Sequence, residues 1–255
     1  AASLIWVLLL ALFFTEHPQD HPRITLAELA TLPPPKTRTT KVAWGRLFKR
    51  MVPVALVYFC YGWTLWLFLS WIPQYFLHSY SLDLKKSAIF ASSVFFAGVL
   101  GDTLGGIISD KILRKTGNLK YARSLLVATG MTGALLSLLP LLIIHDLYIS
   151  LACLASGFFF SELCIGPMWA IPMDIAPEYS GTASGMMNTG SALAAIISPV
   201  ASGFLIDMTG SWEVPFIGSM ILMGVGVLLS FRMKPERKFQ PEENPVAATL
   251  ESTPA

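Results

Sequence analysis

"GDTLGGIISDKILRKTG", residues 101 to 117, runs from a glycine-rich apolar segment into a cluster of positive charge. Gly101, Gly105 and Gly106 lie at helical spacings that let a neighbouring helix approach closely. Asp110 ends the apolar segment, and a short basic loop follows it. The pattern predicts two packed helices joined at a hinge, where charge contacts form in one state and break in another.

The composition of the chain is that of a membrane protein. Of its 255 residues, 54% are hydrophobic and only 13% are charged, and the mean hydropathy is +0.60. Windows of about 20 residues that are nearly free of charge recur, and each is long enough as a helix to cross a hydrocarbon layer of about 30 Å. We therefore predict an all-α integral membrane protein with six transmembrane helices, at residues 51–77, 87–109, 122–144, 148–170, 181–206 and 212–231.

Four segments make up the predicted organisation. The apolar run "SLIWVLLLALFF" is only about 12 residues long, below spanning length. It lacks a basic leader and a cleavage site, so we interpret it as the end of a preceding transmembrane helix and expect the chain to be the second part of something longer. The segments are the helix end at 1–14, a Pro-containing linker at 15–50, a six-helix bundle at 51–232 and a disordered tail at 233–255.

The last part of the predicted linker, "KVAWGRLFKRM", allows two interpretations. It could form a short amphipathic helix on the membrane surface, with Trp44, Leu47 and Phe48 toward lipid and its basic residues toward headgroups. It could equally be a plain basic loop.

The distribution of Lys and Arg predicts the orientation. Basic residues accumulate in short cytoplasmic loops, and of the 18 in this chain only Lys85 and Lys86 fall on the side opposite the linker and the tail. We therefore predict a multi-pass protein of the cell (inner) membrane whose linker and tail are cytoplasmic. Because the positive residues border the spans, we predict no nucleic-acid partner.

Motifs of other function classes are absent from the sequence. There is no GxxxxGK[ST] loop, nucleophile elbow or HExxH pair, so we predict neither nucleotide hydrolysis nor an enzyme. No Cys or His spacing suggests a metal or another cofactor. Transport driven by an ion gradient remains as the natural class. Such transporters bind substrate near the membrane midplane between two repeats.

The loop after the second span resembles a signature of the major facilitator superfamily. Gly106, Asp110, Lys111, Arg114 and Lys115 match it in part, although Leu113 stands where the signature usually repeats a glycine. The resemblance implies that the six spans are the C-terminal half of a twelve-helix fold and that these residues form a gating loop. The N-terminal six-helix half is then the expected partner, covalent or separate.

Asp102 lies two helical turns before Asp110, about 12 Å deeper at 1.5 Å per residue. Water can reach a carboxylate at that depth. We therefore predict a gate or an interhelical charge contact for Asp102 rather than a substrate contact.

The stretch "DIAPEYSGTASGMMNTG", residues 174 to 190, is similar to the anion:cation symporter branch of that superfamily. Members of the branch carry sugar acids and other organic carboxylates, typically with protons in bacteria. The resemblance therefore implies H+ as the coupling ion, with Na+ as the alternative. The resemblance implies import of a small organic anion by cation-coupled alternating access, and it places Asn188 in the substrate cavity. An interhelical hydrogen bond is the structural alternative for Asn188. Ser191 shares its helical face and is a second candidate, while Gly181 and Gly185 predict close helix packing.

Glu162 is a carboxylate near the middle of an apolar span, which is costly in lipid. Three accounts remain open: it couples proton loss to substrate movement, it pairs with a cation of the other half, or it stays protonated as a structural group. Tyr58, Tyr61 and Gln74 in the first span are candidates for lining the substrate cavity, and packing alone explains each of them equally well.

Two other functions are compatible with six such spans. The chain could be a non-transporting membrane partner or fragment that binds a full transporter through its small-residue faces. It could also belong to a multidrug exporter of the same superfamily, a class that favours hydrophobic cations. No span carries a deep Arg or Lys, so the cation that neutralises an anionic substrate is expected in the other half.

Overall fold

A computed structural model of the chain describes residues 2–15, 21, 23–31 and 43–240. Its contacts divide into two units, Ala1–Lys41 and Val42–Ala255. The first unit holds the apolar helix α1 (Ala2–Phe13) and the short helix α2 (Leu26–Thr31). That α1 is the end of a preceding transmembrane helix stays a prediction.

A capping box begins α2. The Glu28 N–H donates to Thr25 Oγ1 at 3.3 Å, and the Glu28 carboxylate accepts from the Thr25 N–H at 2.9 Å. The bond from this N–H holds the pKa of Glu28 below its usual value.

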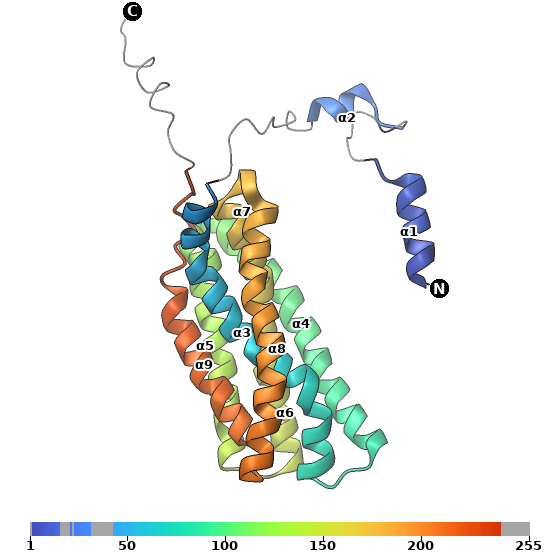
Figure 1. Cartoon of the computed structure of the whole chain (residues 1–255), viewed down its shortest axis with the longest axis vertical. Coiled ribbons are helices and arrows are strands. Elements are labelled where there is room, and N and C mark those ends of the chain that lie inside the picture. Colours follow the sequence, from blue (N-terminus) through green and yellow to red (C-terminus); the bar gives the residue numbers. More distant parts are fainter. Residues whose placement is uncertain (1, 16–20, 22, 32–42, 241–255) are drawn as a thin grey trace, which may run out of the picture. The chain divides into compact units, whose positions relative to one another are not determined.

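The second unit is a bundle of long helices (Figure 1). Each predicted span overlaps one helical run, in the predicted order. Five runs are long and apolar enough to cross a membrane, and the sixth, α9, is shorter at 17 residues. The runs are α3 (Trp44–Ser79); α4 (Leu84–Thr116); η2 (Lys120–Leu125), α5 (Leu126–Leu138) and η3 (Leu139–Leu142); α6 (Leu147–Glu162) and α7 (Ile165–Ile175); η4 (Pro177–Tyr179) and α8 (Ser180–Thr209); and α9 (Val214–Ser230).

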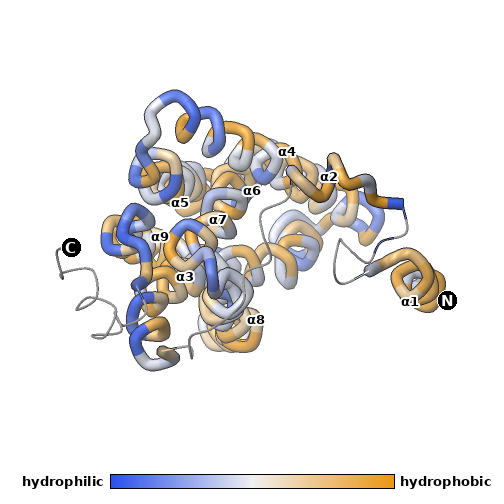
Figure 2. Tube along the Cα trace, turned by 90° about the horizontal axis from the view of Figure 1, so that it is seen from above, coloured by the Kyte–Doolittle hydropathy of each residue, from blue (hydrophilic) through white to orange (hydrophobic). Residues whose placement is uncertain are grey.

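Hydrophobic residues occur along all of these helices (Figure 2), and many of the exposed side chains on them are apolar. Phe96, Ile196, Val200 and Leu228 are each more than 60% exposed. Exposed apolar side chains over helices of this length are expected to contact lipid. We call the end of the bundle where α3 begins and α9 ends the near end, and the opposite end the far end.

Helix α3 begins seven residues before the predicted span. Leu47, Met51 and Val54, at spacings i, i+4 and i+7, are all almost fully buried, so the core-facing stripe of α3 continues into the predicted linker. The linker boundary at residue 50 is therefore wrong, and Leu47 faces the core rather than lipid. Trp44 and Phe48 are exposed, as the amphipathic interpretation predicts.

Residues 233–240, which we call the strap, pack against the near end of the bundle. Met233 is fully buried, and the Phe239 N–H donates to the Ile175 carbonyl at 2.7 Å. The Phe239 ring packs edge-on against Tyr179 with centroids 6.1 Å apart. The predicted disordered tail is therefore wrong for the strap, because the buried Met233 and the half-buried Phe239 offset the entropy of ordering it. The rest of that tail, 241–255, lies outside the described residues.

Arg50 of α3 holds the strap in place. Its guanidinium donates to the carbonyl oxygens of Met233 at 2.9 Å, Lys234 at 2.7 Å and Arg237 at 3.0 Å. A planar guanidinium with five donors suits such a fan of acceptors.

We expect Arg50→Ala to lower the free energy of unfolding by about 2 kcal/mol, because hydrogen bonds from a charged donor are lost. The measurement is thermal unfolding of the purified chain in detergent. Lys49→Ala is the control, since Lys49 is an exposed neighbour. Equal losses of stability in the two variants would contradict the role of Arg50.

Helix α4 approaches α6 and α7 backbone to backbone. A Cβ on Gly101 would lie 2.1 Å from the Phe159 carbonyl oxygen, and one on Gly105 would lie 2.2 Å from that of Leu163. The predicted small-residue face of α4 is therefore confirmed. On α8, by contrast, a Cβ on Gly181 or Gly185 would meet nothing within 4 Å among the described residues.

Helix α8 instead packs on α3 through Gly190. A Cβ there would lie 2.1 Å from the Ala55 carbonyl oxygen. The close approach predicted for this helix thus exists within the bundle, but it lies one to two turns beyond Gly185.

The fourth span is broken between α6 and α7 at Leu163 and Cys164. Pro167 explains the break, because it lacks the N–H that would bond the Leu163 carbonyl and its ring crowds that same carbonyl. The break sets Glu162 at the last residue of α6.

Candidate functional site

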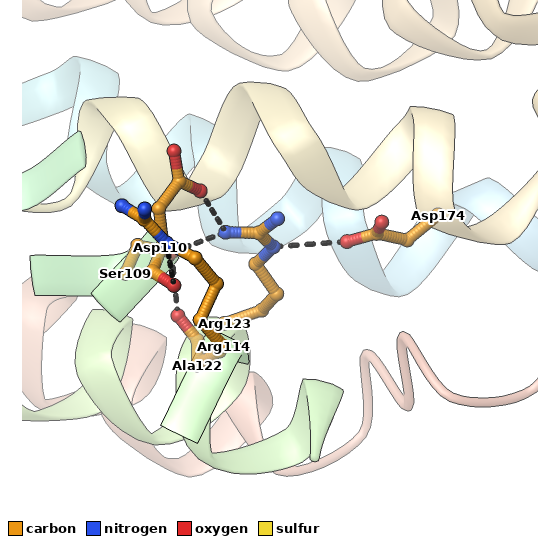
Figure 3. Close-up of polar contacts among 6 residues, drawn as sticks. All are labelled: Ser109, Asp110, Arg114, Ala122, Arg123 and Asp174. Carbon is orange, nitrogen blue, oxygen red and sulfur yellow. Dashed lines mark hydrogen bonds and ion pairs between the residues drawn. The ribbon is translucent and has the colours of Figure 1, made fainter. Parts of the chain in front are cut away.

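A buried arginine lies at the centre of a charge cluster at the near end of the bundle (Figure 3). Arg123 Nε donates to Asp174 Oδ2 at 2.9 Å. Its Nη1 donates to Ser109 Oγ and lies 3.5 Å from Asp110 Oδ1. We call Ser109, Asp110, Arg123 and Asp174 the arginine cluster.

Three elements supply the arginine cluster. Ser109 and Asp110 end the apolar part of α4, Arg123 lies in the π-helical segment η2, and Asp174 lies in the last turn of α7. Ser109 Oγ donates in turn to the Ala122 carbonyl at 2.8 Å, which ties α4 to the backbone of η2. π-Helical turns are rare and often occur at functional sites.

The side chains of the cluster differ in exposure. That of Arg123 is 7% exposed, that of Asp174 21% and that of Asp110 64%. A buried guanidinium is costly unless it is paired. The two carboxylates approach it from two sides (Figure 3), so a movement of α4 relative to α7 must break at least one contact.

The structure brings only some of the predicted gating residues into the arginine cluster. Asp110 belongs to it, and Arg114 Nε donates to the Asp110 carbonyl at 3.4 Å. Gly106 lies against Gly166 of α7, where a Cβ on Gly166 would be 2.8 Å from the Gly106 backbone. Lys111, Lys115 and Asp102 are exposed, and none of the three has a bond to the cluster.

Three members of the cluster, Ser109, Arg123 and Asp174, were missed as functional residues by the sequence reasoning. Ser109 counted only as the end of a predicted span. Arg123 counted only as one loop charge, and Asp174 counted only as part of a family resemblance. The position of each charge at the border of an apolar run is visible in the sequence and could have marked both residues as candidates. Their pairing could not be predicted from local sequence, because they lie 51 residues apart.

A second polar cluster joins α3 to α6 and α7. The Tyr61 hydroxyl donates to Glu162 Oε1 at 2.9 Å, and Trp169 Nε1 donates to the Tyr58 hydroxyl at 2.9 Å. The rings of Tyr58 and Tyr61 stack with centroids 5.3 Å apart. Glu162 is 8% exposed and Tyr61 fully buried. We call Tyr58, Tyr61, Glu162 and Trp169 the glutamate cluster.

The other predicted substrate residues lie apart from the glutamate cluster. Asn188 of α8 is exposed, and its amide makes no hydrogen bond within the described part of the chain. Ser191 is buried against Gly62 of α3 and accepts from Trp66 Nε1 at 3.3 Å. Asn188 and Ser191 thus have different surroundings. Gln74 is exposed and lies 13 residues along α3 from Tyr61, about 20 Å away by helical rise.

An apolar groove of about 270 Å³ lies between α3 and α8. Met51, Ala55, Phe59, Met186 and Leu193 contribute to its lining. No charged side chain belongs to the lining, so the groove by itself has nothing that would neutralise an anion. Among the residues that the structure describes, no group of three or more His, Cys, Asp or Glu side chains could hold a metal ion.

Comparison with known proteins gives relatives that are transporters. The chain is 44% identical over 240 residues to the "Probable sulfoacetate transporter SauU" of Cupriavidus necator, which covers 92% of this chain and 56% of that protein. It is 30% identical over 199 residues to the "Probable galactarate/D-glucarate transporter GudP" of Escherichia coli, which covers 74% of this chain and 42% of that protein. The chain thus spans about half the length of these relatives.

A solved structure supports the fold. The crystal structure of the peptide transporter POT in complex with sulfate matches 80% of this chain and 43% of that one, with a TM-score of 0.59 and 16% identity. The predicted all-α fold with the architecture of a half-transporter is therefore confirmed, and the relatives named here are transporters rather than enzymes. The family model for the Major Facilitator Superfamily matches residues 1–199. Together with the glycine-rich helix, the charged loop and the buried arginine, this match shows that the chain belongs to the Major Facilitator Superfamily.

Proposed function

We propose that the chain is the C-terminal half of a secondary active transporter that imports a small organic anion by cation-coupled alternating access. The arginine cluster is the observation that carries this proposal. It fastens α4, η2 and α7 together at one end of the bundle through charge contacts that can break and re-form.

In the proposed cycle, the intact cluster holds the near end of the bundle in one arrangement. Moving α4 away from α7 separates Asp174 from Arg123, and the buried guanidinium must then gain water or another partner. Alternating access requires two discrete arrangements of this kind, because a binding site near the membrane midplane must open to only one side of the membrane at a time.

We propose that the near end faces the cytoplasm of a cell whose inner membrane holds the protein. The Lys and Arg residues at the ends of α3, α4 and α9, in η2 and in the strap all lie at this end, whereas Lys85 and Lys86 lie at the far end. Such asymmetry is typical of cytoplasmic loops.

We propose a sugar acid or a short sulfonated carboxylate as the substrate. Two relatives carry transporter names for sulfoacetate and for galactarate and D-glucarate, and all three are anions with several oxygen acceptors. Asn188, exposed on α8, can both donate to and accept from such oxygens. The cation that neutralises the anion comes, in this proposal, from the N-terminal six-helix half. The driving ion is H+, with Na+ as the alternative.

We expect cells that express the chain together with its N-terminal half to accumulate labelled sulfoacetate or D-glucarate above the external concentration. A protonophore should abolish accumulation, and replacing Na+ should leave it unchanged. Asn188→Ala should reduce uptake at low substrate concentration, while Thr189→Ala, its neighbour on α8, is the control.

Other outcomes of the uptake experiment would overturn the proposal. Export of a hydrophobic cationic dye without any anion uptake would identify a drug exporter. Copurification with another complete transporter without any uptake would identify a non-transporting partner. If removing Na+ alone abolished accumulation, the coupling ion would be Na+ and not H+.

A further inference from the structure

Glu162 occupies a site that does not suit a permanently charged carboxylate. It is 8% exposed, and among the described residues no lysine, arginine or histidine forms an ion pair with it. It also ends α6 at the break before α7. The carbonyl end of a helix repels negative charge, so the helix itself disfavours a carboxylate there.

The surroundings nevertheless hold the carboxyl group in a defined position. The Tyr61 hydroxyl donates to Oε1 at 2.9 Å, and a Cβ on Gly98 of α4 would lie 3.0 Å from Glu162 Cγ. The hydroxyl can remain hydrogen-bonded to the carboxyl group whether that group is charged or neutral. The carboxyl group thus has one hydrogen-bond donor, Tyr61, and a close neighbouring helix, α4, but no counter-ion among the described residues. Such a site can exchange a proton.

The other titratable groups near Glu162 also favour a carboxyl group that exchanges a proton. Helix α3 contributes Tyr58 and Tyr61, α4 contributes the carboxylate of Asp102, and the break between α6 and α7 contributes the Cys164 thiol. The sequences of α5 and η3, which also pack on α6, have no titratable side chain. None of these neighbours is a cation, and Asp102 has the same sign as an ionised Glu162.

We propose that Glu162 binds and releases a proton during the transport cycle and that Tyr61 is the residue that positions its carboxyl group. The inference rests on the proposed function and deepens it by placing a proton site in this half of the protein. Release of the proton to water leaves a carboxylate in the α4–α6 contact, opposite Asp102. Because burial and like charge both oppose that state, proton release favours separation of α4 from α6, and proton binding favours their close packing.

The first test reads the proton directly. In infrared difference spectra of the purified chain in lipid nanodiscs, a carboxylic-acid carbonyl band should titrate apart from the exposed carboxylates. Glu162→Gln should remove the band and Asp102→Asn should retain it. Tyr61→Phe should shift the frequency of the band, because the hydrogen bond to the carboxyl group is lost. A spectrum of the Glu162→Gln variant identical to that of the parent chain would overturn the inference.

The second test reads coupling in the whole protein with both halves present. For Glu162→Gln we expect exchange of labelled for unlabelled substrate at the parent rate, with loss of accumulation driven by a proton gradient. Gln preserves the shape of Glu and still accepts from Tyr61, so retained exchange also reports a folded variant. If Glu162→Gln accumulated substrate at the parent level, the inference about Glu162 would be refuted and the proposed function would stand. If the parent protein moved no anion, the proposed function would be refuted, and the infrared test would decide the inference about Glu162.

Discussion

Arg123→Ala is expected to lower the free energy of unfolding of the bundle by about 3 kcal/mol, because it leaves carboxylates of α4 and α7 without their cation. Most of this loss of stability should come from the unpaired carboxylate of Asp174, whose side chain is 21% exposed, because Asp110 at 64% can be solvated by water. Thermal unfolding of the purified chain in nanodiscs measures the change in stability.

Two control variants separate charge from geometry at this site. Arg114→Ala should change stability by less than about 0.5 kcal/mol, because Arg114 is exposed and, within the described part of the chain, its side chain bonds the Asp110 carbonyl alone. Arg123→Lys retains the charge but cannot reach Asp174 and Ser109 with one planar fork, so we expect an intermediate loss. If Arg114→Ala cost as much as Arg123→Ala, the stability of this end would depend on total positive charge and not on the arginine cluster.

Gly101→Ala is expected to lower the free energy of unfolding by about 2 to 3 kcal/mol. The added Cβ would lie 2.1 Å from the Phe159 carbonyl oxygen. Backbone atoms cannot rotate away as a side chain can, so α4 and α6 must separate along their whole contact. The measurement is thermal unfolding together with accessibility of a cysteine introduced at the buried position Val94.

The matched control for Gly101→Ala lies on another helix of the same bundle. A Cβ on Gly218 of α9 would meet nothing within 4 Å of the described residues. Gly218→Ala should therefore leave stability unchanged or raise it by about 0.5 to 1 kcal/mol through helix propensity. A comparable loss in both variants would mean that glycine flexibility, and not close packing, matters at residue 101.

The sequence was informative wherever a property depends on neighbours along the chain. Long apolar windows placed all six helical runs, and the glycine spacing of α4 identified the face that packs on α6. The same reasoning failed at Leu47 and in the strap. In both places a few apolar residues within a polar segment are buried by partners far away in the chain.

The candidate sites were less predictable for the same reason. Glu162 was recognised as costly from its position alone, but Tyr61, its hydrogen-bond donor, lies 101 residues away. Arg123 was missed because a basic residue at the start of a span is usually a loop charge. Its burial depends on the π-helical turn and on Asp174, and neither can be read from local pattern.

The strap also has a consequence for how the protein is made. Arg50 meets the Met233 carbonyl across 183 residues of chain, so at about 5 to 20 residues per second a ribosome needs about 10 to 40 seconds to supply the partner. Throughout that interval all six helices are synthesised while the guanidinium has none of its strap acceptors. During insertion the charged guanidinium of Arg50 can keep the start of α3 at the membrane surface. Once the last helix has been synthesised, the same guanidinium can bind the strap carbonyls.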